Sequence, residues 1–479
     1  MHTSYPVSPF SGSSSPPPSG RSSPPRRRAR LAALGLAAVL SASALSGCGS
    51  ASGAGSSALT MWTFKQSHVA GLRAAAAEFE RKTGIQVAIQ AYTPEDAYSI
   101  KVQSSAMTGD LPDVFEVHSD GEDFVYGAAG IVEDLRGQIP ASWNNRFNPA
   151  VRQSGTVTQD KYDQSLPVTS TSHGAKKGAR YSLPFTIGTF GIVYANKAKL
   201  AAAGITRPPA TWEEFIADLK KTKAKEPRTG GLSLGLKVPS TGLNWIGQPL
   251  AFAQLGKEGY EALYGREKSA DWGSPNGTEV LTAYDQLTPY WMPGTQTLTI
   301  DDADQAFAQG KSAFDVGGTF TLAFLQEAGM KADDILAFGL PAPARGTVKD
   351  LALGPIALTG LALNGSSPRE DQAKRWMRFL SEPDVAARFS KAASDLSATE
   401  LGAEAADVLG PNLARLMETF KGTPENTYNP YDTSFRPPTL DMDEAGAPLI
   451  DMSPLRQTDP ARTGLRLRKL LESYWKAAK

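Results

Sequence analysis

The sequence predicts an α/β protein with a mostly parallel sheet covered by helices, and with more than one domain. Within about 60 residues of its folded part, apolar patterns of period two alternate with patterns of period 3.6. The same alternation resumes after residue 187. The chain has 479 residues, which is too many for one ordinary domain, and its 41% hydrophobic content can fill packed cores.

The first run of elements begins at residue 59. Apolar side chains alternate over residues 59–64, 85–89 and 111–117, as they do in strands. Between these strands, residues 67–83 and 95–107 place apolar side chains on one helical face, and a glycine follows each helix. Strands joined by helices in this way imply parallel pairing.

The second run begins with a predicted strand over residues 187–194 and a short helix over residues 196–203. Thr211 and Glu214 form the pattern of a capping box, in which each side chain accepts a free backbone N–H. A helix is therefore predicted from Thr211. Further helices are predicted after Ser367 and at the end of the chain, with an irregular, proline-rich loop over residues 426–438.

The first 47 residues are predicted to be a lipoprotein signal peptide. Four arginines between residues 26 and 30 precede a small, apolar stretch over residues 31–45. A membrane-spanning helix needs about 20 strongly apolar residues, so this stretch is too short to be one. Leu-Ser-Gly-Cys at 45–48 resembles the lipobox of bacterial lipoproteins, which implies lipidation of Cys48. Residues 48–57 are then a flexible tether.

Charge and cysteine content exclude several classes of site. Cys48 is the one cysteine of the chain, so intrachain disulfides and multi-cysteine metal sites are excluded. Residues 48–479 carry 44 basic and 49 acidic side chains, a net charge of −5, which argues against a nucleic-acid partner. We expect no cofactor and no dedicated metal site, and we expect a monomer.

One motif resembles a catalytic element. Gly-Leu-Ser-Leu-Gly at 231–235 matches the nucleophile elbow of hydrolases, which needs a histidine later in the chain. The four histidines of the chain all precede Ser233. The sequence therefore favours a binding protein over an enzyme, although glycan hydrolysis by a pair of carboxylates stays open.

A series of short motifs points to a family. The motifs are Gly-Asp-Leu-Pro-Asp-Val at 109–114, Tyr-Ala-Asn-Lys at 194–197, Pro-Ala-Thr-Trp-Glu-Glu at 209–214, Phe-Ala-Gln-Gly-Lys-Ser-Ala at 307–313 and Gly-Gly-Thr-Phe at 317–320. In order and spacing, this part of the chain, over residues 58–390, resembles the extracellular solute-binding proteins of sugar ABC importers, the family of maltose-binding protein. Phe320 stands where relatives often carry tryptophan.

The resemblance implies a two-lobed, periplasmic-binding-protein-like fold, whose discontinuous lobes are joined by a hinge with a ligand cleft between them. Lobe 1 is expected over residues 58–184 and 339–390, and lobe 2 over residues 185–338 and 391–479. The crossings between lobes are expected near residues 183–185, 338–341 and 385–395.

The candidate ligand-binding residues follow from the chemistry of a sugar, which has hydroxyls around its rim and an apolar C–H face. A cleft for it needs polar groups in the ring plane and an aromatic side chain against the face. Residues that follow predicted strands or begin predicted helices meet this need, and Tyr428 lies in the late loop. The candidates are Phe64, Lys65, His118, Ser119, Asp120, Glu122, Asn244, Trp245, Thr319, Phe320 and Tyr428.

The function implied by the resemblance is capture of a carbohydrate by hinge closure and its delivery to the permease subunits of an ABC importer. The protein would be anchored at the outer face of the cytoplasmic membrane by a lipid on Cys48. Two other classes stay open: a two-lobed sensor or adhesion lipoprotein, and a glycan hydrolase. A binding protein closes on its ligand without turnover, whereas a hydrolase releases product.

Overall fold

The computed structural model describes residues 58–402 and 405–478. The predicted signal peptide, the tether and Cys48 lie outside these residues. Within them, none of the helices combines the length and the apolar character that crossing a membrane requires.

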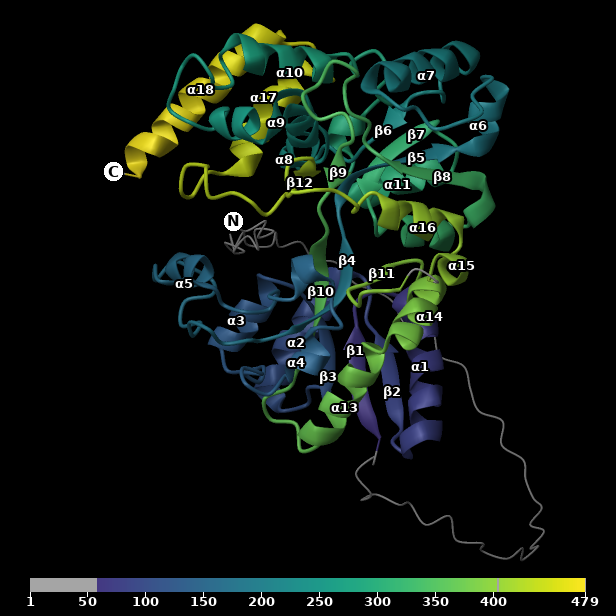
Figure 1. Ribbon diagram of the computed structural model, residues 1–479, viewed down its shortest axis with the longest axis vertical. Helices are drawn as coiled ribbons and strands as arrows, with labels where there is room; N and C mark the ends of the chain where they lie inside the picture. Colours follow the sequence, from purple (N-terminus) through teal and green to yellow (C-terminus); the bar gives the residue numbers. More distant parts are fainter. Residues whose placement is uncertain (1–57, 403–404, 479) are drawn as a thin grey trace, which may run out of the picture. The chain divides into compact units, whose positions relative to one another are not determined.

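A six-stranded mixed sheet forms the first half of the fold (Figure 1). Its strand order is β11-β4-β10-β3-β1-β2. The strands β1, β2 and β3 pair in parallel, as the sequence predicts, while β10 and β11 are antiparallel to their neighbours. Their bounds are β1 (Leu59–Thr63), β2 (Val87–Ala91), β3 (Val114–His118), β4 (Leu183–Gly188), β10 (Ile356–Leu363) and β11 (Leu396–Ser397).

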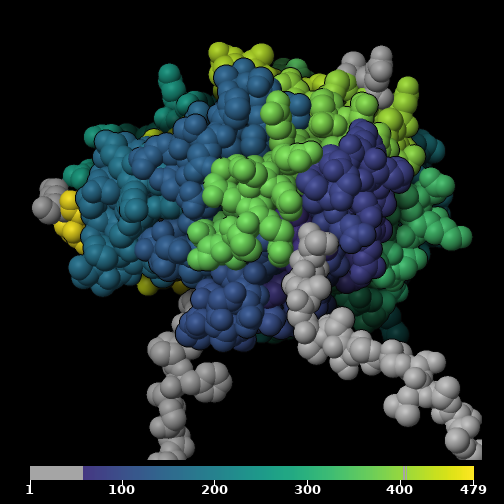
Figure 2. Space-filling view, turned by 90° about the horizontal axis from the view of Figure 1, so that it is seen from below, coloured from purple at the N-terminus to yellow at the C-terminus, as the bar shows by residue number. Residues whose placement is uncertain are grey.

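Helices from both ends of the chain pack around this sheet. The Lys82 ammonium lies 5.1 Å from the centre of the Phe379 ring, and Arg388 pairs with Glu78 at 2.7 Å. Figure 2 shows the late segment, in green, between the purple N-terminal segment and the blue one. The helices are α1 (His68–Thr83), α2 (Glu95–Thr108), α3 (Glu122–Ala128), α4 (Ala141–Asn144), α5 (Gln159–Ser165), α13 (Glu370–Leu380) and α14 (Pro383–Ala393), with a 3-10 turn η1 (Pro149–Val151).

A four-stranded sheet of order β6-β7-β5-β8 forms the second half. Its strands are β5 (Phe190–Asn196), β6 (Leu232–Ser233), β7 (Phe314–Gly318) and β8 (Ile335–Gly339). A small parallel pair joins β9 (Ala352–Leu353) to β12 (Thr427–Tyr428). Strand β12 lies within the loop that was predicted to be irregular. The remaining elements are α6 (Lys197–Ala202), α7 (Trp212–Lys225), α8 (Ser240–Gly242), η2 (Leu243–Gly247), α9 (Gln248–Ala262), α10 (Pro275–Asp285), η3 (Thr295–Thr297), α11 (Ile300–Ala308), α12 (Thr321–Glu327), η4 (Ala332–Asp334), α15 (Ala405–Leu409), α16 (Pro411–Glu418), α17 (Met442–Met452) and α18 (Pro460–Ala477).

The strand predicted over residues 187–194 is wrong, because two strands of different sheets share this stretch. Strand β4 ends at Gly188 in the six-stranded sheet, and β5 begins at Phe190 in the four-stranded sheet. The stretch is largely apolar on both sides of Thr189, and Thr186 already interrupts it within β4, so the pattern alone does not mark the crossing. The crossing therefore comes after the expected residues 183–185.

The second crossing begins within the expected residues 338–341, and the third comes just after the expected residues 385–395. The chain leaves the four-stranded sheet with β8 and enters the six-stranded sheet with β10, which starts at Ile356. It leaves the six-stranded sheet for the last time after β11, which ends at Ser397. The three chain passages make both halves of the fold discontinuous. The lobe boundaries at 184/185, 338/339 and 390/391 remain a prediction.

The capping box predicted at Thr211 forms in part. The Thr211 hydroxyl accepts a hydrogen bond from the Glu214 backbone N–H at 3.2 Å. The Glu214 carboxylate accepts from Ala210 N at 2.9 Å, one residue before the capping residue.

Ser233, the candidate elbow nucleophile, is fully buried in β6 and donates to Asp315 Oδ1 at 2.6 Å. It is therefore an interior residue.

Candidate functional site

The carboxyl ends of β1 and β3 meet at one edge of the six-stranded sheet, because these two strands are parallel neighbours. Phe64 follows β1, and its ring stacks on the His118 ring at the end of β3, with centroids 4.8 Å apart and planes 15° apart. Four predicted residues gather at the end of β3. We call His118, Ser119, Asp120 and Glu122 the polar edge.

The His118 ring lies between two carboxylates. Its Nδ1 is 3.5 Å from Glu122 Oε2, and its Nε2 is 3.5 Å from Glu95 Oε1. Burial alone would lower the pKa of His118, but the hydrogen bond to Glu122 and the charge of Glu95 outweigh it and raise the pKa. Glu95, at the start of α2, was not among the predicted residues. The side chain of His118 is still 44% exposed, so part of its imidazole ring is accessible to a ligand.

Asp120 turns the chain between β3 and α3. Its backbone has a left-handed φ of 59°, which is uncommon for a residue with a side chain, and its Oδ1 accepts from Gly155 N at 2.9 Å. The neighbouring Asp123 is buried, and burial together with the charge of Asp120 raises the pKa of Asp123 to about 7. The buried Ser119 hydroxyl has no hydrogen-bond partner among the described residues. The polar edge therefore offers the carboxylate acceptors of Asp120 and Glu122, whereas the Ser119 hydroxyl lies in the interior.

Lys65 is turned toward the interior of the protein. Its Nζ is 2.8 Å from Asp395 Oδ2, and Asp395 also lies 3.1 Å from the buried His68. On its other side, His68 Nδ1 is 3.1 Å from Glu116 Oε2. Lys65 therefore contributes its charge to a buried ion network, which we call the Asp395 network (Lys65, His68, Glu116 and Asp395).

Three aromatic side chains gather on the four-stranded sheet. Phe190 stacks on Trp245, with centroids 5.2 Å apart and planes 6° apart, and Phe320 meets both rings edge-on at 6.4 and 6.2 Å. We call Phe190, Trp245 and Phe320 the aromatic trio. Trp245 is only 6% exposed and supports Phe190 from behind, whereas Phe190 and Phe320 are half-buried. Phe190 was missed because the sequence pattern places it inside one continuous strand.

Thr319 fixes the crossing between the two sheets. Its N–H donates to Thr189 O at 3.0 Å, and its Oγ1 accepts from Thr189 N at 3.3 Å. A Cβ added to Gly188 would lie 1.9 Å from Thr319 Oγ1, so only glycine fits at the end of β4. Thr319 thereby ties the segment that carries Phe320 to the first crossing.

Two buried aspartates lie beneath the same segment. Asp304 Oδ2 accepts from Thr321 Oγ1 at 3.1 Å, and Asp315 Oδ1 accepts from Ser233 Oγ at 2.6 Å. Asp304 Oδ1 and Asp315 Oδ2 are buried and have no hydrogen-bond donor among the described residues, so one carboxyl group must carry a proton for the two to bond to each other. Burial, with the charge of Asp315 added, raises the pKa of Asp304 well above its usual range, and burial raises the pKa of Asp315 to about 7. The pair therefore holds a proton at mildly acidic pH.

This pair predicts a pH dependence of stability. Both folded-state pKa values lie above the ordinary value of 3.8, so the folded protein binds more protons than the unfolded one. The free energy of unfolding should fall as the pH rises from about 4 to about 7. Asp304→Asn should flatten this fall, because an amide donates to Asp315 without a titratable proton. Urea unfolding across this pH range tests it, and equal slopes in the two proteins would contradict it.

The structure separates Tyr428 from the other candidates. Its ring is 2% exposed and lies edge-on to Phe252, and its hydroxyl donates to Gln248 Oε1 at 2.7 Å. We leave it out of the proposed site for this reason. Tyr431, three residues later, is 49% exposed, and partial burial with the charges of Asp120 and Asp123 raises its pKa. Tyr431 is therefore the more exposed tyrosine of this loop.

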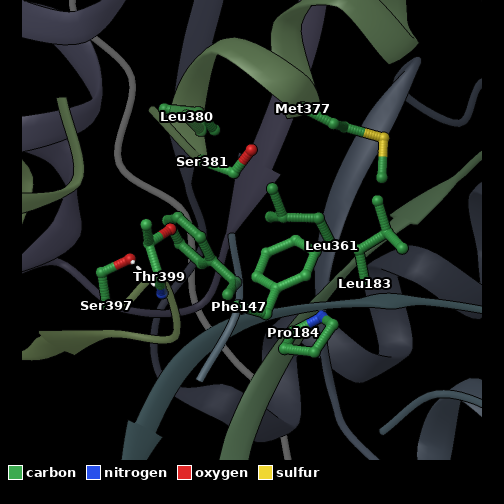
Figure 3. A pocket seen from close by; sticks show the side chains of 10 residues that line it. Phe147, Leu183, Pro184, Leu361, Met377, Leu380, Ser381, Ser397 and Thr399 are labelled. Atoms are coloured by element: carbon green, nitrogen blue, oxygen red, sulfur yellow. Dashed lines mark hydrogen bonds between the residues drawn. The ribbon is translucent and has the colours of Figure 1, made fainter. Parts of the chain in front are cut away.

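Two hollows among the described residues lie away from these groups. One is a void of about 10 Å³ between Phe147, Leu361 and Met377, close to the smallest volume that holds a water molecule (Figure 3). The other is a groove of about 270 Å³ on the outside of α7, lined by Arg207 and Lys221. Neither reaches the polar edge or the aromatic trio.

Comparison with known proteins decides the family. The model of the family described as bacterial extracellular solute-binding protein matches residues 65–387, about two thirds of the chain. The chain belongs to this family. In this solute-binding protein the matched segment begins just after β1 and ends within α14, and it includes both the polar edge and the aromatic trio.

The solute-binding protein also resembles individual relatives. YcjN of Escherichia coli (strain K12), whose name assigns it provisionally to ABC transporter periplasmic-binding proteins, is 25% identical over 311 residues, which are 64% of each chain. The chain spans 54% to 64% of the length of the curated relatives it matches.

Solved structures share the two-lobed fold. A solute-binding protein of Thermotoga lettingae bound to α-D-tagatose covers 88% of this chain and 100% of its own, with a TM-score of 0.59 and 20% identity. RafE in complex with raffinose covers 87% of this chain and 99% of its own, with a TM-score of 0.57 and 16% identity. These likenesses confirm the predicted fold class.

Proposed function

We propose that this solute-binding protein captures a neutral carbohydrate between the polar edge and the aromatic trio, and delivers it to an ABC importer. The observation that carries the proposal is the pairing of two unlike surfaces. The carboxylates of the polar edge suit sugar hydroxyls, and the half-buried rings of Phe190 and Phe320 suit an apolar C–H face.

The position of Tyr431 supports a site that both halves share. Tyr431 follows β12 in the second half of the fold, and burial together with the charges of Asp120 and Asp123 raises its pKa. A hydroxyl within electrostatic reach of the polar edge can close over a bound sugar when the hinge closes. The structural relatives named above bind raffinose and tagatose, which agrees with a carbohydrate ligand.

Membrane attachment is part of the proposal. The arginines, the short apolar stretch and Leu-Ser-Gly-Cys at 45–48 support lipidation of Cys48 after export. The protein would then work at the outer face of the cytoplasmic membrane. There the folded part hands its sugar to the permease subunits and performs no reaction on it.

A thermal-shift screen of residues 49–479 tests the carbohydrate proposal. We expect raffinose, D-tagatose, maltotriose or acarbose to raise the melting temperature. A sugar at about 100 times its dissociation constant adds about 2.7 kcal/mol to the free energy of unfolding. Chromatography should recover the sugar unchanged. The proposal is wrong if no sugar in a broad panel of sugars and polyols shifts the melting temperature, or if the sugar is cleaved.

A further inference from the structure

A buried hydrogen-bond network surrounds the side chain of Gln248, at the start of α9. Its Oε1 lies 2.7 Å from Arg436 Nη2, 2.7 Å from Tyr428 Oη and 3.0 Å from Tyr260 Oη. Gln248 is 1% exposed, and Arg436 is 6% exposed. Groups this deep in the protein keep their partners, because an unpaired buried polar atom is costly.

The network fixes which way round the Gln248 amide lies. The oxygen and nitrogen of an amide look alike in most structures, so their assignment rests on the partners. Arg436 settles it here, since a guanidinium has five N–H donors and no acceptor. The atom that faces Arg436 must therefore be the carbonyl oxygen. The amide nitrogen Nε2 then points the other way.

This orientation passes to Asn244. Gln248 Nε2 lies 2.9 Å from Asn244 Oδ1, one helical turn earlier in η2. Because Gln248 can only donate at this contact, Asn244 must accept with its oxygen. Its Nδ2 has no hydrogen-bond partner among the described residues, and the side chain is half-buried. Asn244 stands next to Trp245 of the aromatic trio, in a π-helical turn, a feature that is frequent at functional sites.

We infer that Gln248 is a positioning residue that holds the Asn244 amide with its N–H donors free for the solute. The site would therefore recognise a hydrogen-bond acceptor beside the aromatic trio. The inference rests on the proposed function, and it adds that the site presents hydrogen-bond donors at this place. A ring oxygen, a glycosidic oxygen or a hydroxyl lone pair satisfies Asn244 Nδ2, whereas an ammonium group at the same place does not.

Gln248→Glu reverses this polarity without removing an atom from the fold. The new carboxylate still accepts from Arg436, Tyr260 and Tyr428, so the protein should stay folded. It can only accept from Asn244, whose amide must rotate and present its oxygen to the solute. We expect titration calorimetry with raffinose, D-tagatose, maltotriose and acarbose to give at least about tenfold weaker binding for whichever of these sugars bind the wild type.

The matched control is Gln286→Glu, on the same half of the fold. Gln286 Oε1 accepts from Trp212 Nε1 at 2.9 Å, a bond that a carboxylate also makes, and it takes no part in the Gln248 network. We expect this variant to bind the sugars as the wild type does. Equal or tighter binding by Gln248→Glu would overturn the inference, because a purely structural Gln248 gains an ion pair with Arg436 and loses nothing.

A measurement without sugar separates this inference from the carbohydrate proposal. In side-chain ¹⁵N NMR, the Asn244 NH2 group, assigned with Asn244→Asp, should exchange quickly with water in the wild type and slowly in Gln248→Glu. The Gln248 NH2 group should be protected in the wild type. A protected Asn244 NH2 in the wild type would overturn the inference whatever the sugars do. If the NMR pattern holds and no sugar binds the wild type, the carbohydrate proposal alone fails.

Discussion

Asp395→Ala is expected to lower the free energy of unfolding by about 3 to 5 kcal/mol, the largest stability effect of any single ion pair that we anticipate. Asp395 is 1% exposed and is the shared partner of Lys65 Nζ at 2.8 Å and His68 Nε2 at 3.1 Å. Its removal leaves a lysine and a histidine in the interior with one carboxylate fewer. Buried charges without partners are costly because no water replaces the lost contacts.

The pH dependence of this loss identifies its cause. Burial alone would raise the pKa of Asp395, but the charges of Lys65 and His68 hold it well below its usual range. Its contribution is therefore present above the unfolded pKa of about 4 and is lost as the pH falls. Burial opposes protonation of His68, but Glu116 and Asp395 raise its pKa, so its share is complete below about pH 6.5 and fades as the pH rises through the folded value. The difference from wild type should be greatest between about pH 4 and pH 6.5.

Asp451→Ala is the control for this prediction. Asp451 pairs with Arg466 at 2.7 Å, but the side chains are 31% and 49% exposed, and such solvated pairs contribute less than about 1 kcal/mol. Urea titrations of the three proteins measure the free energies. A loss of less than about 1 kcal/mol for Asp395→Ala would mean that Lys65 and His68 find other partners or release their protons.

Much of the fold could be predicted because its signals are local. The strand at residue 59 and the helix that follows it carry their periods in consecutive residues, and the structure confirms both as β1 and α1. The crossing at Thr189 could not be found this way. Strands β4 and β5 are both buried and largely apolar, and Thr189 between them looks like Thr186 inside β4, so it does not mark the point where the chain changes sheets.

The candidate site follows the same division. Phe64, His118 and Asp120 were predictable because residues that follow parallel neighbours must meet at one sheet edge. The partners of Lys65 and Gln248 were not predictable, because Asp395 lies 330 residues from Lys65 and Arg436 lies 188 residues from Gln248. Contacts over such separations depend on packing, which no local pattern records. Lys65 illustrates this, since its place at a strand end is as predicted while its charge faces inward.

Phe320→Ala is expected to weaken sugar binding by at least about 2 kcal/mol, roughly 30-fold. Phe320 is half-buried beside Phe190 and Trp245, and it stands where the family resemblance places a ligand-stacking tryptophan. Removing its ring takes away apolar contact with the C–H face of the sugar while leaving the polar edge intact. The loss should appear for every neutral sugar that binds, because a ring face does not distinguish hydroxyl positions.

Two further variants separate stacking from a general effect on the fold. Phe324→Ala removes the same side chain one turn later on α12, where it is also half-buried but lies outside the aromatic trio. It should keep the wild-type affinity. Phe320→Trp restores the residue common in relatives and offers a larger face, so it should bind at least as tightly as the wild type. Equal losses for Phe320→Ala and Phe324→Ala would place the sugar elsewhere and leave the aromatic trio as a packing cluster between the crossing and η2.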